Sequence, residues 1–574
     1  MFSTMQDVEL SVGRILNHAR SVHNSSTVTT WRNDAPEQST FAELIGRAAA
    51  CANALRDELN ITGDQRVGSL MFNSTEHLEI MLAACGMGAV FTPLNRQLMP
   101  DQIAYIVQHS GTEVIFADRR LAHQLNEVLE LVTCVRAVVF VGEEPAPQLP
   151  AHLATYAYEA LLDARSTLFA WPEQDERTAA ALCYSTGTTG LPKGVLYSHR
   201  SLYLQAMMLR TTDSMAITHG NSILCCAPIY HLLSWGVPLA ALMSGTNMVL
   251  PDHDVSPARL AKIIEATHPR VAHGVPSVWT QLMVHYLHNP PSRMSLTEIY
   301  VGGSPASPAL IKVWEERYGV DIVHVWGMTE TSTGVTVARP PSGVSGEARW
   351  AYRESQGRFP PSVQYRVVND GEVVASTDRN QGEIQVRGNV VAASYVPITG
   401  LPPTDADGPG APTTFRGNPV RPPQSAFTED GWLRTGDVGS VTADGFLVVS
   451  DRARDVIRSG GEWIYSAQVE NVIMDSDLVV ECAVIGVPDE KWGERPLAVT
   501  VLHDGVSPNA DTANAIRSSA QSQLPTWMIP EYWTFVQSID KTSVGKFDKK
   551  DLRMYREQGR FDIIKLESPG RSRR

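Results

Sequence analysis

The sequence lacks an excess of positive charge, a cysteine framework and a long unbroken apolar segment. Its 574 residues include 48 Lys and Arg against 62 Asp and Glu, a formal net charge of −14. No general attraction therefore draws the chain to nucleic acid or to an anionic membrane surface, and any phosphate must be held by local groups. With 43% hydrophobic residues, the chain can bury a large core in more than one domain, which excludes a disordered chain and a small stapled scaffold.

The cysteines and the N-terminus exclude other classes. The seven cysteines are scattered and contain no C-x-x-C pair, so we predict reduced, mostly buried thiols rather than disulfides or a zinc site. Asp7 and Glu9 stand where a secretory signal needs basic and then apolar residues. The most apolar segment, residues 223–250, is interrupted by prolines, glycines and a histidine. We therefore expect a cytoplasmic protein with no stable membrane insertion.

From residue 66 onward, short apolar runs typical of strands alternate with helical patterns, which predicts an α/β fold with mostly parallel sheets. Residues 397–425 contain eight prolines and four glycines, too many for a packed element, so a loop or mobile insertion is expected. After it, a strand-rich stretch leads into two strands and a helix. We predict a large N-terminal domain of several subdomains, residues 1–450, and a small, mobile α+β domain, residues 451–574.

The most informative stretch is YSTGTTGLPKG, residues 184–194. Gly187 and Gly190 free the backbone so that successive N–H groups can converge, and Lys193 adds a positive charge. Four hydroxyls add further donors, those of Ser185, Thr186, Thr188 and Thr189. This pattern predicts a phosphate cradle, although the P-loop pattern of kinases and GTPases is absent because Lys193 is followed by Gly194. The alternative is a polar turn without a ligand.

The stretch YSTGTTGLPKGV resembles the signature of the adenylate-forming superfamily, which contains acyl-CoA synthetases, peptide-synthetase adenylation domains and luciferases. Seven further blocks resemble the family's other signatures in the expected order, between about residues 40 and 555. The first and sixth of them are most similar to medium- and long-chain fatty-acyl-CoA synthetases. The blocks are PIYHLLSWG (228–236), VGGSP (301–305), VWGMTETS (325–332), GEIQVRG (382–388), GWLRTGDVG (431–439), DRARDVIRSGGEWI (451–464) and TSVGKFDKKDLR (542–553).

The resemblance implies an AMP-forming acid:CoA ligase that uses ATP, Mg²⁺ and coenzyme A. In the first half-reaction a carboxylate attacks the α-phosphate of ATP, so cations must screen two negative groups. The resemblance assigns Lys546 to the carboxylate and the α-phosphate, Thr329 to the α-phosphate, and Lys193 to the phosphate loop. It assigns Mg²⁺ to Glu330 and to a hydroxyl of Ser185 or Thr186.

The resemblance also assigns the residues that bind the nucleoside. Asp437 looks like the carboxylate that accepts hydrogen bonds from the ribose hydroxyls, with Arg452 as its cationic partner. Trp326 stands where many relatives have tyrosine, so stacking on the base is kept while a phenolic hydrogen bond is lost. The other residues expected along the nucleotide are Ser185, Thr186, Gly187, Thr188, Thr189, Gly190, Gly302, Gly303, Ser304, Val325 and Gly327.

In the second half-reaction the thiol of coenzyme A attacks the acyl-adenylate, after the small domain has rotated about a hinge. The resemblance places this hinge at Arg454, where relatives commonly carry Asp or Lys. Arg keeps a positive charge but cannot act as a carboxylate. Arg458, Gly460, Gly461 and Trp463 resemble the loop that meets phosphates in one orientation and the pantetheine tunnel in the other.

The acid is expected near His231 and Trp235, which would share one face of a helical turn. Such a Trp gates the acyl tunnel in the fatty-acyl relatives, whereas the alternative is a core histidine packed beside a core tryptophan. Gly302 and Gly303 are expected to line the same region. The neighbouring residues are apolar and offer no cation for a second acidic group, so we predict a hydrophobic monocarboxylic acid. A bulky aromatic or terpenoid acid is the alternative.

Two other functions compete with the ligase. One is a stand-alone acyl-adenylating enzyme that hands acyl-AMP to a carrier protein or partner, although nothing resembling a carrier domain follows Arg553. The other is a nucleotide-binding protein that has lost catalysis, which is disfavoured because the residues assigned to both steps are present. Similarity to the fatty-acyl relatives also suggests a homodimer.

Overall fold

The computed structural model describes residues 3–143, 149–185, 191–377, 380–397, 414–415, 418–419, 426–459, 462–489, 491–541 and 547–566. The chain divides into two compact units. Unit 1 comprises Met1–Gln364 and Val386–Leu433, and unit 2 comprises Tyr365–Gln385 and Arg434–Arg574. This confirms a mixed α/β fold with a large N-terminal part and a smaller C-terminal part. The predicted boundary near residue 450 refers to the start of a domain that moves as one body, and it stays a prediction.

The first sheet of unit 1 has seven strands, in the order β7 (Ala154–Ala157), β6 (Ala137–Val141), β5 (Thr112–Asp118), β3 (Arg66–Leu70), β4 (Val90–Pro93), β8 (Ala179–Ser185) and β9 (Lys193–Ser198). The strands from β7 to β8 pair in parallel, whereas β9 runs antiparallel to β8. Along β5, Phe116 and Ile115 belong to different core clusters, because successive strand side chains point to opposite faces.

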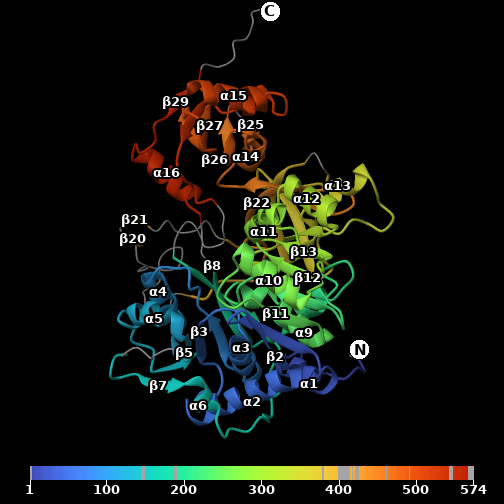
Figure 1. Ribbon diagram of the computed structural model, residues 1–574, viewed down its shortest axis with the longest axis vertical. Coiled ribbons are helices and arrows are strands. Elements are labelled where there is room, and N and C mark those ends of the chain that lie inside the picture. Colours follow the sequence, from blue (N-terminus) through green and yellow to red (C-terminus); the bar gives the residue numbers. More distant parts are fainter. Residues whose placement is uncertain are drawn as a thin grey trace, which may run out of the picture. The chain divides into compact units, whose positions relative to one another are not determined.

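Helices cover both faces of this sheet. They are α2 (Phe41–Asp57), α3 (Thr75–Met87) and α6 (Tyr158–Leu162) in one cluster, and α4 (Pro100–Ser110) and α5 (Ala122–Leu129) in the other. Figure 1 shows α4 and α5 together beside strands β3 and β5. Helix α3 begins where the Ser74 side chain accepts a hydrogen bond from the N–H of His77, and it ends at Gly88, whose φ is +97°. These are common start and stop signals of helices.

The second sheet of unit 1 has the strand order β16 (Gly357–Arg358), β15 (Thr336–Val337), β14 (Asp321–Trp326), β13 (Glu298–Val301), β12 (Val271–Gly274), β10 (Ser222–Cys225), β11 (Asn247–Leu250), β1 (Thr27–Arg32) and β2 (Ala35–Thr40). The strands from β14 to β1 pair in parallel, and β15 and β2 are antiparallel to their neighbours. The sequence patterns predicted the central strands but not the β1–β2 hairpin.

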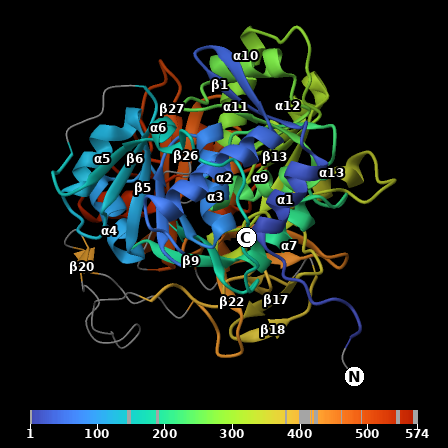
Figure 2. The same cartoon turned by 90° about the horizontal axis from the view of Figure 1, so that it is seen from below.

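Helices also cover this second sheet. Its two faces are packed by α10 (Pro257–Thr267), α11 (Pro276–His288) and α12 (Pro308–Tyr318), and by α1 (Val12–Val22), α7 (His199–Leu209), α8 (Leu232–Trp235) and α9 (Val237–Ser244). Figure 2 shows α1 near α9, two helices that contact each other. The remaining elements of unit 1 are α13 (Glu347–Glu354), β20 (Thr414–Phe415), β21 (Asn418–Pro419) and the 3-10 turns η1 (Arg119–Leu121) and η2 (Thr329–Thr331).

Unit 2 contains two groups of strands. In the first, β17 (Val363–Asn369) pairs antiparallel with β18 (Glu372–Val374), and β22 (Leu433–Val441) pairs antiparallel with β23 (Phe446–Arg452), with β19 (Gly382–Gly388) between the two pairs. The second group is a six-stranded sheet of β24 (Ile457–Ser459), β25 (Glu462–Ile464), β26 (Val479–Asp489), β27 (Gly493–Leu502), β28 (Tyr532–Phe535) and β29 (Ile564–Lys565).

The helices of unit 2 lie on opposite faces of the six-stranded sheet. They are α14 (Ser466–Met474) and α15 (Ala510–Ala520) on one face and α16 (Lys549–Glu557) on the other, and the unit also has the 3-10 turn η3 (Thr526–Met528). Along β26, Cys482 and Val484 join the first core and Ala483 and Ile485 the second. The two strands and the helix that the sequence predicted here are present.

The composition also gave predictions for the cysteines, the apolar segments and the proline-rich stretch. All seven cysteines are free and only Cys134 is partly exposed, which confirms buried thiols without disulfides. Within the described part of the chain, no helix combines the length and the apolar character needed to cross a membrane. The proline-rich stretch 397–425 lies outside the described residues apart from Pro397 and the short strands β20 and β21.

Candidate active site

The predicted phosphate loop joins β8 to the antiparallel β9. The register pairs Ser185 directly with Lys193 and Tyr184 with Gly194. The two ends of the loop are therefore held next to each other, with one hydroxyl and one ammonium group at its base. Thr186, Gly187, Thr188, Thr189 and Gly190 lie outside the described residues.

Glu330 is held by a tyrosine that the sequence patterns did not single out. Its side chain is buried, and its Oε1 accepts a hydrogen bond of 2.7 Å from the hydroxyl of Tyr395. The Nζ atom of Lys193 lies 4.7 Å from the centroid of the Tyr395 ring, within the range of a cation–π contact. Tyr395 thus connects the predicted metal ligand to the lysine of the predicted phosphate loop.

The backbone around Tyr395 makes the same connection. The N–H of Ala392 donates to the carbonyl of Glu330 at 2.7 Å, and the N–H of Val396 donates to the carbonyl of Gly194 at 2.9 Å. Burial raises the pKa of Tyr395 and the neighbouring Glu330 carboxylate raises it further, so the hydroxyl keeps its proton and donates. Residues 392–396 therefore link two motifs that lie far apart in the sequence.

The groups near Glu330 fit a magnesium ion carried by ATP. Across the described ranges, no cluster of three or more His, Cys, Asp or Glu side chains could hold a metal ion by itself. Mg²⁺ commonly takes one or two carboxylates and completes its shell with phosphate oxygens and water. Strand β8, which ends at Ser185, contacts the turn η2 that carries Glu330. One buried carboxylate and one hydroxyl are hard oxygen donors of the right kind.

The turn after β14 is fixed from two sides. The hydroxyl of Tyr197 donates to the carbonyl of Thr329 at 2.5 Å, next to Glu330. A Cβ atom on Gly327 would lie 2.6 Å from the backbone nitrogen of Gly334, so only glycine fits there. Trp326 is 8% exposed and meets Phe359 edge-on at 5.8 Å between ring centroids. The predicted Val325 and Trp326 therefore end strand β14, and Gly327 to Glu330 form the tight turn that follows.

The predicted glycines after β13 lie against this turn. A Cβ atom on Gly302 would lie 2.7 Å from the carbonyl oxygen of Val325 and 3.3 Å from the Trp235 ring. Gly303 has a φ of +84°, which L side chains rarely adopt, and the partly exposed Ser304 follows it. The structure therefore brings residues assigned to the base and to the acid into contact.

The segment around Trp235 differs from the right-handed turn that the spacing suggested. Leu232, Leu233, Ser234 and Trp235 all have positive φ values between 36° and 61°, so the turn is left-handed. The His231 ring lies against Tyr230, with centroids 4.8 Å apart, whereas the Trp235 ring lies 5.2 Å from that of His273. The argument that a right-handed turn puts His231 and Trp235 on one face therefore does not apply.

Histidine 273 is a further residue that the sequence patterns missed. It is fully buried on β12, its Nε2 lies 3.4 Å from the Ser234 hydroxyl, and burial lowers its pKa to about 3. A neutral imidazole between Ser234 and Trp235 can accept or donate a hydrogen bond without bringing charge to an apolar region. No periodic pattern marks such a residue, because it lies in a short buried strand.

In unit 2 the structure pairs Asp437 with Arg452. These residues face each other in the register of β22 and β23, and Arg452 Nε lies 2.8 Å from Asp437 Oδ1. Arg452 also donates to the carbonyl of Thr435 at 3.2 Å. Asp437 is 4% exposed, so the pair is largely shielded from solvent. This is the arrangement expected of a carboxylate with a cationic partner, while its role in ribose binding stays a prediction.

Carboxylates on both sides of Arg454 are linked to helix α16, Asp455 directly and Asp451 through Ser466. Arg553 Nη2 donates to the Asp455 carboxylate at 2.5 Å and to the carbonyl of Arg454 at 3.3 Å. One turn earlier on the same helix, Lys549 Nζ lies 2.7 Å from Glu470 Oε1 and donates to the Ser466 hydroxyl at 2.6 Å. The Ser466 hydroxyl donates in turn to the carboxylate of Asp451 at 2.6 Å.

The other predicted residues of unit 2 are only partly described. Arg458 and Trp463 are register partners on β24 and β25, and the Arg458 guanidinium lies 5.8 Å from the Trp463 ring centroid. The N–H of Arg458 donates to the carboxylate of Glu494 at 2.9 Å. Gly460 and Gly461, between the two strands, and Lys546 lie outside the described residues.

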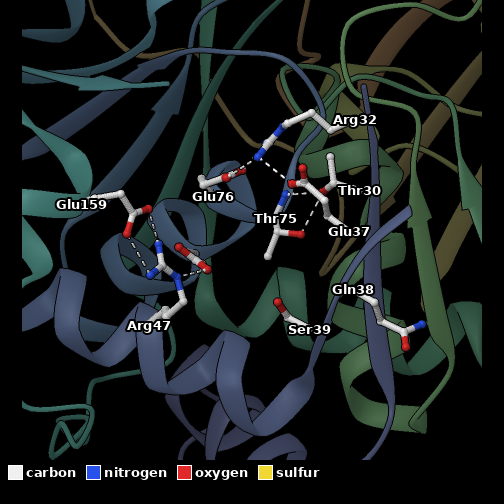
Figure 3. A pocket seen from close by; sticks show the side chains of 10 residues that line it. Thr30, Arg32, Glu37, Gln38, Ser39, Arg47, Thr75, Glu76 and Glu159 are labelled. Carbon is white, nitrogen blue, oxygen red and sulfur yellow. Dashed lines mark hydrogen bonds and ion pairs between the residues drawn. The ribbon is translucent and has the colours of Figure 1, made fainter. Parts of the chain in front are cut away.

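A separate polar hollow of about 280 Å³ opens in unit 1 (Figure 3). Arg32 lies 2.9 Å from both Glu37 and Glu76, and Arg47 lies 2.7 Å from both Glu79 and Glu159. None of the lining residues is a predicted site residue, and each arginine already has two carboxylate partners. The lining residues are Thr30, Arg32, Glu37, Gln38, Ser39, Arg47, Thr75, Glu76, Glu79 and Glu159.

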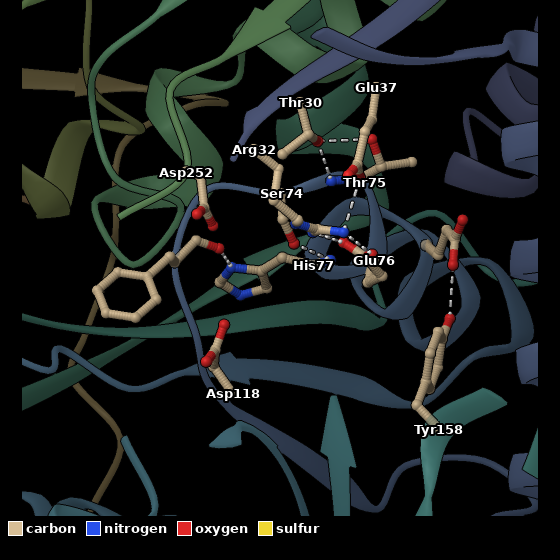
Figure 4. Close-up of polar contacts among 12 residues, drawn as sticks. Thr30, Arg32, Glu37, Ser74, Thr75, Glu76, His77, Asp118, Tyr158 and Asp252 are labelled. Atoms are coloured by element: carbon tan, nitrogen blue, oxygen red, sulfur yellow. Dashed lines mark hydrogen bonds and ion pairs between the residues drawn. The ribbon is translucent and has the colours of Figure 1, made fainter. Parts of the chain in front are cut away.

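Side chains around this hollow are paired with neighbouring polar side chains (Figure 4). The hydroxyl of Tyr158 donates to Glu79 at 2.8 Å, and burial raises the pKa of Glu79 to about 7 although Arg47 opposes it. His77 bonds the carbonyl of Phe72 and the Ser69 hydroxyl, both at 2.8 Å. These contacts satisfy the polar groups internally and leave the hollow without a catalytic constellation.

Comparisons with known proteins agree with the motifs. The family described as AMP-binding enzyme matches residues 17–396, and the AMP-binding enzyme C-terminal domain matches residues 468–546. The chain is 32% identical over 561 residues to a 3-methylmercaptopropionyl-CoA ligase of Ruegeria lacuscaerulensis, covering 96% of this chain and 98% of the relative. It is 34% identical over 558 residues to a long-chain-fatty-acid–CoA ligase of Thermus thermophilus, covering 96% of each.

A solved structure supports the fold. The crystal structure of the anthranilate CoA ligase AuaEII in complex with anthranoyl-AMP superposes with a TM-score of 0.82 at 21% sequence identity. The match covers 98% of this chain and 100% of that chain. Both units therefore have the architecture of known proteins.

Proposed function

The chain belongs to the AMP-binding enzyme family, and on this premise we propose that it is an ATP-dependent acid:CoA ligase. It joins a carboxylic acid to AMP with release of pyrophosphate and then transfers the acyl group to coenzyme A. The observation that carries the proposal is the contact of Tyr395 with both Lys193 and Glu330. Through this contact a cation and a buried carboxylate lie close together at the base of the predicted phosphate loop.

These residues have distinct tasks in the first half-reaction. Lys193 and the loop that it closes hold phosphate oxygens, and Thr329 lies beside the α-phosphate. Glu330 and a hydroxyl of Ser185 or Thr186 would hold Mg²⁺, which would neutralise phosphate charge. Lys546 adds positive charge at the carboxylate and the α-phosphate, where negative charge is concentrated in the transition state.

The nucleoside and coenzyme A use the other assigned residues. Trp326 stacks on the base and Asp437, aligned by Arg452, binds the ribose. Arg458 and Trp463 meet the phosphates first and coenzyme A later, after the small domain has turned about Arg454.

The acid is a hydrophobic monocarboxylic acid. Trp235, Leu232 and Val237 are buried, and the Trp235 ring lies near Gly302. These apolar side chains supply a lining without a cation for a second acidic group. The two relatives are about equally similar to this chain, yet their names specify a short thioether acid and a long-chain fatty acid. Overall identity therefore does not select the chain length.

A turnover screen tests the proposal. Purified protein with Mg²⁺, ATP and coenzyme A is incubated with saturated fatty acids from butyrate to palmitate, with 3-methylmercaptopropionate, and with benzoate and cinnamate. We expect pyrophosphate release and an acyl-CoA product, identified by mass spectrometry, with at least one aliphatic acid. Acyl-AMP without acyl-CoA would favour the stand-alone adenylating enzyme, turnover of only the aromatic acids would favour the bulky-acid alternative, and no pyrophosphate with any acid contradicts the ligase.

The variant Lys546→Ala tests the assigned lysine in the same assay. We expect adenylation to fall by at least about 100-fold, while ATP binding, measured by calorimetry, stays within about threefold. Unchanged adenylation would remove Lys546 from the mechanism. A cytoplasmic location and a homodimer belong to the same proposal, and light scattering of the purified protein tests the dimer.

A further inference from the structure

Gln205, on helix α7, binds two turns that carry or adjoin predicted site residues. It is fully buried, and its Nε2 atom donates to the carbonyl of Trp235 at 3.2 Å and to the carbonyl of Thr333 at 2.9 Å. The same nitrogen also contacts the carbonyl of Ser332. Because all three partners are acceptors, the nitrogen rather than the oxygen of the amide must point toward them.

Both segments that Gln205 binds are left-handed. The first is the turn Leu232–Trp235 described above, and the second contains Ser332 and Thr333, whose φ values are 55° and 43°. Left-handed backbone costs L-residues about 1–2 kcal/mol each, so such turns persist only where the surroundings hold them. The amide of Gln205 is one group that holds both.

The two turns belong to different substrates of the proposed reaction. The first carries Trp235, which lies beside Gly302 and His273 in the expected acid region. The second directly follows Glu330 at the expected phosphate and metal site. Gln205 is thus a single buried amide shared between the acid side and the nucleotide side.

The packing leaves this amide little freedom. A Cβ atom on Gly236 would lie 2.8 Å from Gln205 Oε1, so the glycine is needed for the close approach of the two groups. Oε1 is also among the buried polar atoms without a hydrogen-bond partner in the described part of the chain. A buried unpaired oxygen costs stability, so the residue is better explained by its amide donor than by packing.

We propose that Gln205 is a positioning residue that couples nucleotide binding to the conformation of the Trp235 turn, an inference that rests on the proposed ligase function. A shift of the 332–333 backbone on nucleotide binding moves the amide, and the amide moves the carbonyl of Trp235 with it. Mg²⁺ and nucleotide then change the affinity for the acid, and by linkage the acid changes the affinity for nucleotide equally.

Hydrogen–deuterium exchange tests this coupling without turnover. The full chain is compared with and without Mg²⁺ and α,β-methylene-ATP. We expect the nucleotide to slow exchange in peptides from residues 326–337 and also from residues 228–240. In Gln205→Met, which is of similar length but has no donor, the first region should still respond and the second should not.

A matched control comes from elsewhere in unit 1. Gln124 Nε2 also donates to two backbone carbonyls, those of Arg96 at 2.8 Å and Leu98 at 3.2 Å. Gln124→Met should leave both responses as in the wild type. No nucleotide effect on residues 228–240 in the wild type, or the same effect in Gln205→Met, would overturn the proposal.

Acid binding provides a second measurement. The probe is the acid of the turnover screen with the highest rate, titrated by calorimetry with and without Mg²⁺ and α,β-methylene-ATP. We expect at least about a fivefold change in its Kd in the wild type, a common size for coupled sites, and less than about twofold in Gln205→Met. Should that variant not fold, Gln205→Asn keeps the amide on a side chain too short to reach both turns and should also lose the coupling.

The two proposals fail in different ways. Acyl-CoA formation by the wild type together with unchanged coupling in both Gln205 variants would overturn the coupling and leave the ligase standing. Absence of turnover in the wild type would contradict the ligase, and with it the assignment of the Trp235 turn to the acid.

Discussion

The two units bury polar side chains in different ways. Unit 1 holds every buried histidine of the described residues, and burial lowers the pKa of each of them, so that the rings are neutral at pH 7. These residues are His77, His199, His273 and His324. Unit 2 instead concentrates ions around α16, whose two cations Lys549 and Arg553 meet three carboxylates and a serine. These partners are Asp455, Glu470, Ser466 and, bound through Ser466, Asp451.

This difference has a consequence for the stability of each unit. A neutral buried ring needs hydrogen bonds but no counter-charge, whereas a buried ion is tolerated only while its partner is in place. In unit 2, the ion pairs and hydrogen bonds that depend most on both partners therefore lie on both sides of Arg454, the predicted hinge. Four substitutions, in decreasing order of expected effect, test this contrast.

Lys549→Met removes the central cation of unit 2. Glu470 is buried, and although burial raises its pKa, Lys549 stabilises its charged form. Removing one partner of a buried ion pair costs about 3–5 kcal/mol, because the other charge is left uncompensated. We expect a loss of this size in urea unfolding of the full chain. The double variant with Glu470→Gln should regain much of the loss, and equal stability of the single variant and the wild type would show that the pair is not needed.

His199→Asn tests the neutral rings of unit 1. The pKa of His199 is lowered to about 4 by burial, so the folded protein does not bind the proton that the unfolded chain binds below about pH 6.5. The stability from this ring is complete above pH 6.5 and is lost as the pH falls toward 4, by up to about 3 kcal/mol.

The measurement is the free energy of unfolding in urea at pH 7.5, 6 and 5. We expect the wild type to lose stability as the pH falls, and His199→Asn to lose about 2 kcal/mol less between pH 7.5 and 5. An identical pH dependence in the two proteins would mean that His199 is already accessible to protons in the folded state.

Tyr395→Phe tests the hydroxyl–carboxylate contact of unit 1, and a matched variant tests such a contact in unit 2. The variant keeps the ring beside Lys193 but removes the hydrogen bond to Glu330, and a hydrogen bond to a charged group is worth about 1.5–3 kcal/mol. We expect the half-saturating Mg²⁺ concentration to rise about tenfold in pyrophosphate exchange. Binding of Mn²⁺ with α,β-methylene-ATP, followed by electron paramagnetic resonance, should weaken likewise.

The matched control is Tyr532→Phe in unit 2, which removes a hydroxyl contact of 3.1 Å to the Asp489 carboxylate. Metal dependence should not change in this variant. A similar shift in both variants would trace the effect to general destabilisation rather than to the position of Glu330.

Arg454→Ala should have the smallest effect on stability. Its Nε lies 3.7 Å from Asp455, the side chain is 44% exposed, and Arg553 already binds the same carboxylate. Exposed pairs contribute about 0–1 kcal/mol, so urea unfolding should differ from the wild type by less than about 1 kcal/mol. A loss as large as that of Lys549→Met would show that Arg454 belongs to the buried network.

Local signals predicted much of the fold. The alternating pattern from residue 66 onward predicted helices between the strands. Helix α3 is one of them, and it lies between a serine cap and a glycine stop that are both visible in the sequence. Strand β2 was missed because APEQST has no apolar alternation and contains Pro36. Its extended form depends on pairing with β1, and sequence patterns do not report such distant partners.

In the candidate site, too, local motifs were predictable and distant partners were not. Ser185, Lys193, Glu330 and Asp437 lie in motifs whose spacing marks them, and the structure gives each a defined contact or position. Tyr395, Gln205 and His273 carry no such mark, because only the folded chain brings them to the motifs. The left-handed turn at Leu232–Trp235 was also unforeseen, since it contains no glycine and depends on tertiary hydrogen bonds.

The shielding of all seven thiols makes the chain suitable for fluorescence labelling. Six are buried and Cys134 is partly exposed, and burial raises the pKa of every one, which suppresses the reactive thiolate. In a Cys134→Ser background, maleimide dyes would therefore attach only to cysteines introduced on the surface. With one dye on each unit, the proposed rotation of the small domain would be read in real time as a change in energy transfer during turnover.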